Sequence, residues 1–130
     1  MFKIDGTTIH LTRGDACIIS VGANIFKSDG TKTPHEFVDG DVISFAIYDK
    51  KKFDKSPILL KEVINDSNKE RINIPLNSSD TKIGDILNKP HVYWYEIQLN
   101  HNQTLIGFDN DGAKEFILYP EGADPEWYKN

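Results

Sequence analysis

The residues that most often carry out chemistry in proteins are few in this chain and lie far apart. Cys17 is its only cysteine. It alternates in phase with Ile19 and Val21, on the side that we assign to the core, and a buried cysteine is inert as a nucleophile. None of the histidines forms the short spacing of a zinc motif with another histidine or with Cys17. The four histidines are His10, His35, His91 and His101.

The local motifs of the common enzyme classes are also missing. The run Asp109-Asn110-Asp111-Gly112 faintly resembles a calcium-binding loop, but Glu115 follows too early to close such a loop, and a hairpin turn explains the same residues. There is no glycine-rich phosphate loop, no nucleophile elbow and no carboxylate pair that spacing picks out. We therefore expect no catalytic residues, no metal, no cofactor and no enzymatic activity.

Aromatic side chains remain as candidates for binding. Trp94 is out of phase with the tyrosines on either side of it, so it belongs to the face opposite theirs. Either both faces of that strand are covered within the chain, or Trp94 lies in an exposed patch that contacts a partner or a sugar. Two aromatic residues near the C-terminal end allow the same two interpretations. The candidate interface or glycan contacts are therefore Trp94, Tyr93, Trp127 and Tyr128.

Composition limits the classes of function further. The chain has 130 residues, which suits one domain, and a formal charge of -5, which argues against broad binding to nucleic acid. No apolar run approaches the ~20 residues of a membrane-spanning helix. The first residues also lack the apolar stretch of a signal peptide. We expect neither membrane insertion nor nucleic-acid binding.

Two-residue alternation of polarity is the dominant pattern and predicts strands. It is clearest in residues 17–25, 41–48, 71–76 and 91–99, and a last strand is expected over 113–119. Seven or eight such strands, separated by turns, predict an all-β fold, an antiparallel immunoglobulin-like sandwich. Pro75 cannot donate a ladder hydrogen bond, so its strand is expected to lie at an edge or to end there, and the last strand is a second candidate edge.

One short helix is expected near residues 79–88. Ser79 or Asp80 would cap it, and its apolar side would carry Ile83, Ile86 and Leu87. Residues 1–119 then make a single β-sandwich domain. Residues 120–130 are expected to form an irregular C-terminal tail, because they contain two prolines, a glycine and several charges.

The order of several short motifs is distinctive. They are Thr12-Arg13-Gly14-Asp15, Asp39-Gly40-Asp41-Val42-Ile43-Ser44-Phe45, Ile74-Pro75-Leu76, Ser79-Asp80-Thr81, Tyr93-Trp94-Tyr95-Glu96-Ile97-Gln98-Leu99 and Glu115-Phe116-Ile117-Leu118. This order resembles small β-sandwich proteins encoded in phage and prophage structural cassettes of Gram-positive bacteria. It is similar to the N-terminal domain of the siphophage baseplate upper protein, over roughly residues 7–119.

The resemblance implies a virion structural or assembly protein without catalytic residues. Its partners would be other phage tail or baseplate proteins, bound by protein–protein contacts, and it could form a homo-oligomer. It would be assembled into the virion in the bacterial cytoplasm. The alternative from the residues themselves is a carbohydrate-binding β-sandwich module that uses exposed aromatic side chains.

Overall fold

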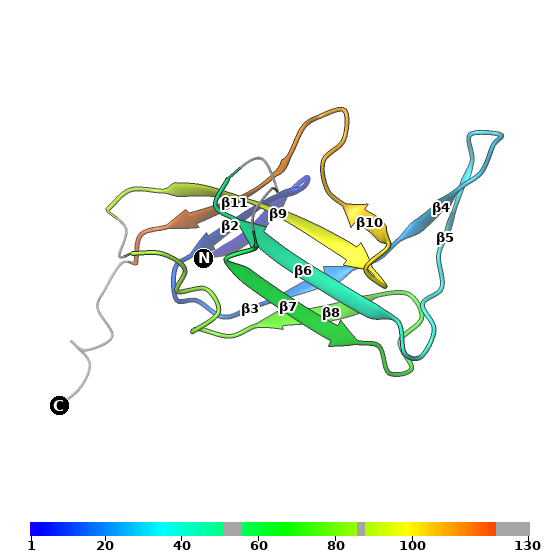
Figure 1. The fold of residues 1–130 in the computed structure, drawn as a ribbon, viewed down its shortest axis with the longest axis horizontal. Coiled ribbons are helices and arrows are strands. Elements are labelled where there is room, and N and C mark those ends of the chain that lie inside the picture. Colours follow the sequence, from blue (N-terminus) through cyan, green and yellow to red (C-terminus); the bar gives the residue numbers. More distant parts are fainter. Residues whose placement is uncertain (51–55, 86–87, 122–130) are drawn as a thin grey trace.

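A computed structural model of the chain describes residues 1–50, 56–85 and 88–121. These residues form strands, turns and loops, without a helix (Figure 1). The strands are β1 (Phe2–Asp5), β2 (Thr8–Thr12), β3 (Cys17–Val21), β4 (Asn24–Phe26), β5 (Lys32–Pro34), β6 (Val42–Tyr48), β7 (Leu59–Ile64), β8 (Ile72–Leu76), β9 (His91–Leu99), β10 (Gln103–Ile106) and β11 (Lys114–Tyr119). The all-β prediction is confirmed.

The strands are grouped into one wide sheet, one narrow sheet and a separate hairpin. The wide sheet has the order β1-β2-β11-β9-β6-β7, and β10 also pairs with β9. Neighbours in it are antiparallel except β2 and β11, which are parallel. The narrow sheet is the antiparallel pair β3 and β8. The hairpin of β4 and β5 extends away from both sheets (Figure 1).

The core lies between the wide and the narrow sheet. Successive side chains of a strand point to opposite faces, so every second residue of each central strand can be buried. In β9 the residues Tyr93, Tyr95, Ile97 and Leu99 are buried, and Trp94 and Gln98 between them are only half-buried. The narrow sheet covers this face with side chains that the same alternation selects: Ile19, Val21, Ile72, Ile74 and Leu76.

The predicted helix near residues 79–88 is wrong for the residues that the structure describes. Residues 77–85 form turns and bends, and residues 86–87 lie outside the described part. Gly84 has a φ of 66°, which belongs to the left-handed region and ends any helical run. Hydrogen bonds from other parts of the chain, described below, take the place of the helical ones.

Three further strand predictions need correction. The expected single strand over 17–25 is divided into β3 and β4. Ile25 is in phase with Ile19 and Val21 and was therefore expected on the core side, but it is half exposed on the hairpin. The last strand, β11, lies between β2 and β9 and is not an edge. The wide sheet contains a parallel pair, because β11 runs beside β2 from far along the chain. By contrast, β8 with Pro75 has one partner, β3, among the described strands, so its edge position is confirmed.

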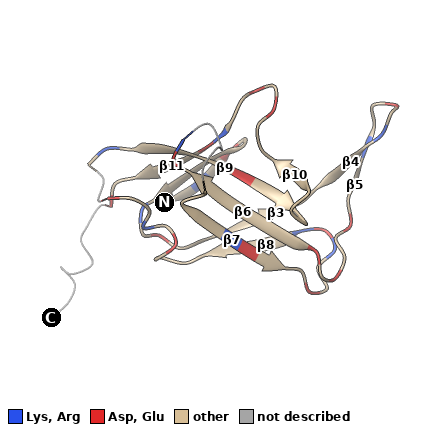
Figure 2. Ribbon diagram, viewed as in Figure 1, with Lys and Arg blue, Asp and Glu red and all other residues tan. Residues whose placement is uncertain are grey.

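Charged residues lie mainly in the loops and turns (Figure 2). The described part of the chain has no helix that is long and apolar enough to cross a membrane. Of the expected irregular tail, the structure describes only Pro120 and Glu121, which are in no strand or helix. Residues 122–130 lie outside the described part.

We predict that removing the ring of Phe116 destabilises the fold strongly. Phe116 is fully buried and packs against Phe45, with ring centroids 6.2 Å apart. Phe116→Ala should therefore lower the free energy of unfolding by about 3–5 kcal/mol, measured by urea denaturation. The control is Phe108→Ala, because the Phe108 side chain is 68% exposed and should change stability by less than about 0.5 kcal/mol. Equal losses in the two variants would contradict the assigned core.

Candidate functional site

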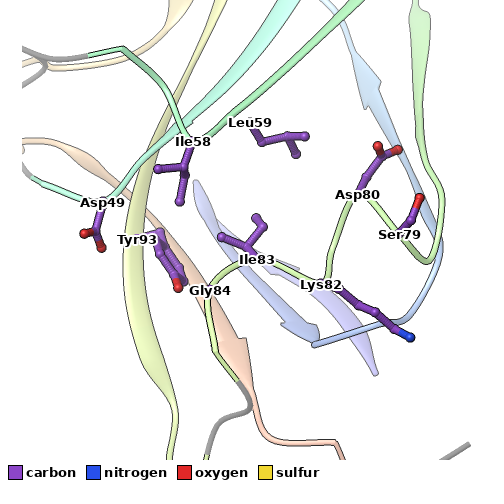
Figure 3. Close-up of a pocket in the computed structure, with 9 residues that line it drawn as sticks. All are labelled: Asp49, Ile58, Leu59, Ser79, Asp80, Lys82, Ile83, Gly84 and Tyr93. Carbon is purple, nitrogen blue, oxygen red and sulfur yellow. The ribbon is translucent and has the colours of Figure 1, made fainter.

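A hollow of about 390 Å³ opens beside the turn segment 79–84, near the starts of β7 and β9 (Figure 3). Asp49 and Asp80 lie on opposite sides of it, while the Lys82 ammonium points away (Figure 3). Apolar side chains and the ring of Tyr93 lie between them. The lining residues are Asp49, Ile58, Leu59, Ser79, Asp80, Lys82, Ile83, Gly84 and Tyr93.

Arg13 holds one wall of this hollow in place. Its guanidinium donates to the carbonyl oxygens of Ile83, at 3.2 Å, and Gly84, at 2.9 Å. It also forms an ion pair with Glu121, at 2.5 Å. Because five guanidinium N–H donors have a fixed fork geometry, one arginine can satisfy several carbonyl oxygens of an irregular segment.

The bend after Arg13 contributes the remaining anchors. The Thr81 hydroxyl donates to the carbonyl oxygen of Asp15, at 2.8 Å, and the Ser78 hydroxyl donates to that of Gly14, at 2.6 Å. Gly14 has a φ of 88°, which permits the sharp turn. The tripeptide Arg13-Gly14-Asp15 therefore forms a structural bend that fixes the wall of the hollow.

Two ionisable groups of the hollow have shifted pKa values, and each shift moves the pKa further from pH 7. The Lys61 ammonium donates to Asp80 at 2.8 Å, and this hydrogen bond, with one from the Asn77 amide, lowers the pKa of Asp80. Burial raises the pKa of Tyr93. At neutral pH Asp80 is thus a carboxylate and Tyr93 a neutral phenol. The two groups can position a ligand by hydrogen bonds but are poorly matched to proton transfer.

A second, smaller hollow of about 220 Å³ lies on the outer face of the wide sheet. Its lining combines the short side chain of Ala46 on β6 with longer side chains from β7 and β9. The Glu62 carboxylate lies 2.9 Å from Nε2 of His101, and the Tyr48 hydroxyl donates to Glu96 at 3.3 Å. The lining residues are Ser44, Ala46, Tyr48, Pro57, Leu60, Glu62, Glu96, Gln98 and His101.

Of the four aromatic residues predicted as contacts, the structure describes two, and these lie on opposite faces of β9. Tyr93 is a core residue, 4% exposed, and also lines the first hollow. Trp94 is half-buried on the opposite face of β9, directly across from Tyr48 on β6. Trp127 and Tyr128 lie outside the described residues. Their role as contacts stays a prediction.

Large apolar side chains are exposed at the extremities of the fold, and sequence reasoning missed them. Ile25 and Phe26 on the projecting hairpin are 50% and 77% exposed. Phe2 and Ile4 on β1 lie opposite Leu11 and Ile9, so they share the core-side face of the sheet, and yet they are 40% and 47% exposed. Alternation identifies which face a residue occupies but not whether a second layer covers it.

The nucleophile and metal candidates remain separate in space. Cys17 is half-buried, and this burial raises the pKa of its thiol to about 11, so the thiol is protonated at neutral pH. In residues 1–50, 56–85 and 88–121 no group of three or more histidine, cysteine, aspartate or glutamate side chains could hold a metal ion. The run 109–112 forms a tight turn in which Asp109 and Gly112 exchange backbone hydrogen bonds.

Comparisons with protein-family models, with curated proteins and with solved structures found no match.

We predict that Gly84→Ala destabilises the protein through Tyr93. A Cβ at position 84 would lie 2.7 Å from the Tyr93 hydroxyl oxygen, in addition to the strain of a side chain at positive φ. The variant should lose more than about 1 kcal/mol, measured by chemical denaturation. The double variant with Tyr93→Phe should lose less than the sum of the two single losses, since the hydroxyl is gone.

Gly112→Ala is the matched control for this prediction. Gly112 also has a positive φ, 92°, but a Cβ there would meet nothing within 4 Å. Its loss should therefore reflect backbone strain alone. Equal losses for Gly84→Ala and Gly112→Ala would show that contact with Tyr93 has no effect.

We predict that the Lys61–Asp80 ion pair makes a pH-dependent contribution to stability. Because the folded pKa of Asp80 lies below its ordinary value of 3.8, the contribution is present above pH 3.8 and is lost as the pH falls through the folded pKa. Asp80→Asn should be less stable than the wild type by about 1 kcal/mol at neutral pH, since the pair is partly exposed. The gap, measured by denaturation at several pH values, should close in acid; a gap independent of pH would contradict this assignment.

Proposed function

We propose that this chain is a non-enzymatic structural or assembly protein of a phage or prophage tail or baseplate. It acts as an immunoglobulin-like β-sandwich module that binds other tail or baseplate proteins and carries no catalytic residues. The order of motifs along the sequence supports this identification, and so does the distribution of exposed apolar side chains. Among the latter, the projecting hairpin of β4 and β5 carries the argument.

The hairpin combines apolar exposure with an ordered backbone. Ile25 lies opposite Thr33 and Phe26 opposite Lys32, so the two apolar side chains lie on opposite faces of the hairpin. Burying the Phe26 ring against a partner would remove most of its exposed apolar surface from water, and such burial is the main favourable term in protein association.

The tip of the hairpin is fixed by its own hydrogen bonds. The Asp29 carboxylate accepts from the Thr31 amide at 2.9 Å and from the Thr31 hydroxyl at 2.6 Å. The Lys27 amide donates to the Thr31 carbonyl oxygen at 2.8 Å. An arm that is ordered before binding loses less conformational entropy when it docks, so its exposed side chains contribute more to affinity.

We predict that substitutions on the hairpin prevent capture of a tail or baseplate protein. The full chain is immobilised, and the tail and baseplate proteins encoded beside its gene are tested for binding by interferometry. The double variant Ile25→Ser with Phe26→Ser should weaken binding at least tenfold, corresponding to about 1.4 kcal/mol or more. Phe108→Ser is the matched control, because Phe108 is comparably exposed but lies outside the hairpin.

Two results would contradict the proposal. One is that none of the tail or baseplate proteins binds the wild-type chain. The other is that the hairpin variant binds as well as the Phe108→Ser control, which would place the contact elsewhere. Circular dichroism of each variant checks that the sheets are intact.

A carbohydrate-binding module is the second candidate, and the outer face of the wide sheet favours it. Trp94 and Tyr48 are direct cross-strand neighbours there, and Tyr48 borders the hollow that contains Glu62 and Glu96. Aromatic rings beside hydrogen-bonding side chains suit a sugar ring. A glycan array with Trp94→Ala as the comparison decides this candidate, and no signal for the wild type would remove it.

A further inference from the structure

We propose that two copies of this chain associate through strand β1, which joins their wide sheets into one continuous sheet across a two-fold axis. This self-association is distinct from the partner contact of the hairpin. It follows from three features of residues 2–6: an unpaired edge, an uncovered apolar face, and a charge pattern that is complementary to itself.

The edge is the first feature. Strand β1 pairs with β2 on one side and has no second partner among the described strands. The Thr12 amide donates to the Met1 carbonyl oxygen at 3.0 Å, so the peptide oxygen of Met1 faces β2. Because these groups alternate in direction along a strand, the amide and carbonyl groups of Phe2 and Ile4 face outward. An edge of this kind is a template for pairing with another strand.

The apolar face is the second feature. Phe2 and Ile4 lie on the core side of the wide sheet, yet both remain exposed because the narrow sheet does not extend over β1. Ile4 is adjacent to the buried Ile9 across the strand pair. A second copy that continues the sheet would place its own Ile4 against this one and would extend the apolar face on the same side.

The charges are the third feature, and they select one register. Lys3 and Asp5 lie on the outer face, and neither has an ion-pair partner among the described residues. In an antiparallel pair centred on Ile4, Lys3 of each copy lies directly opposite Asp5 of the other. Opposite charges in this position are favourable, and like charges are not. A pair centred on Lys3 would instead place the two lysines together.

The same register accommodates Phe2. In it, Phe2 of one copy comes beside the turn at Gly6 of the other, which follows β1 and carries no side chain. A lone lysine on an edge strand normally prevents pairing. Here Asp5, two residues further along, gives Lys3 of a second copy an opposite charge, so the lysine favours pairing.

The expected association is weak, because a four-residue strand buries less than the roughly 1,000 Å² of a stable interface. The test is analytical ultracentrifugation of the full chain from about 10 μM to about 1 mM. The mass of the wild type should rise toward twice the monomer mass. K3D leaves both outer positions acidic, and D5K leaves both basic. Each variant alone should therefore stay monomeric over this range, because its association is at least tenfold weaker than that of the wild type.

Mixing the two variants supplies the decisive result. An equimolar mixture of K3D and D5K restores both opposite-charge pairs, so it should associate as the wild type does. The double variant K3D/D5K should also associate. A wild type that stays monomeric throughout, single variants that associate normally, or a mixture that stays monomeric would each overturn the proposal.

The hairpin variant Ile25→Ser with Phe26→Ser separates this proposal from the proposed function. The hairpin variant should associate as the wild type does. K3D should bind a tail protein through the hairpin as the wild type does. Thermal unfolding of each variant checks the fold, and all of them are expected to fold because the altered side chains are exposed.

Discussion

A wide sheet covered by a narrow one is the constraint on which the rest of this structure depends. The central strands β2, β11 and β9 each bury mainly one face, and β6 is buried at every position from Ile43 to Ile47. Of the described strands, only β3 and β8 form the opposing sheet. Hydrophobic burial scales with the area removed from water, so the centre of the wide sheet is dry and its outer strands are not. The centre of the wide sheet is therefore well packed, whereas its outer strands keep exposed side chains.

The two edge strands of the wide sheet, β1 and β7, differ in the residues that occupy their core-side positions. On β7 the position opposite Phe45 is occupied by Lys61, whose ammonium reaches Asp80. On β1 the equivalent positions are occupied by Phe2 and Ile4 and stay exposed. Strand β7 is thus tied to the segment 77–85 by an ion pair, whereas β1 keeps exposed apolar surface.

The segment 77–85 shows how a piece of chain without regular structure can be fixed. Arg13, Asp15 and Lys61 come from two distant parts of the sequence, and each supplies a hydrogen bond to it. Because these contacts replace the ladder of a helix, the shape of the adjacent hollow depends on tertiary structure. The proposed binding surfaces also depend on tertiary structure, since they are the surfaces that the two sheets do not cover.

The sequence by itself determined the all-β class, the position of many strands and the buried face of the most clearly alternating ones, because alternation of polarity along a strand is a local property of the sequence. Thus Ile19 and Val21 were assigned to the core correctly, whereas Tyr93, predicted as a contact, is a core residue. Only the tertiary structure decided that residues 79–85 form no helix, that β11 is a central strand, and that Ile25 and Ile4 are exposed. Those outcomes depend on which distant strands pair and how far the second layer extends, and no local pattern in the residues contains that information.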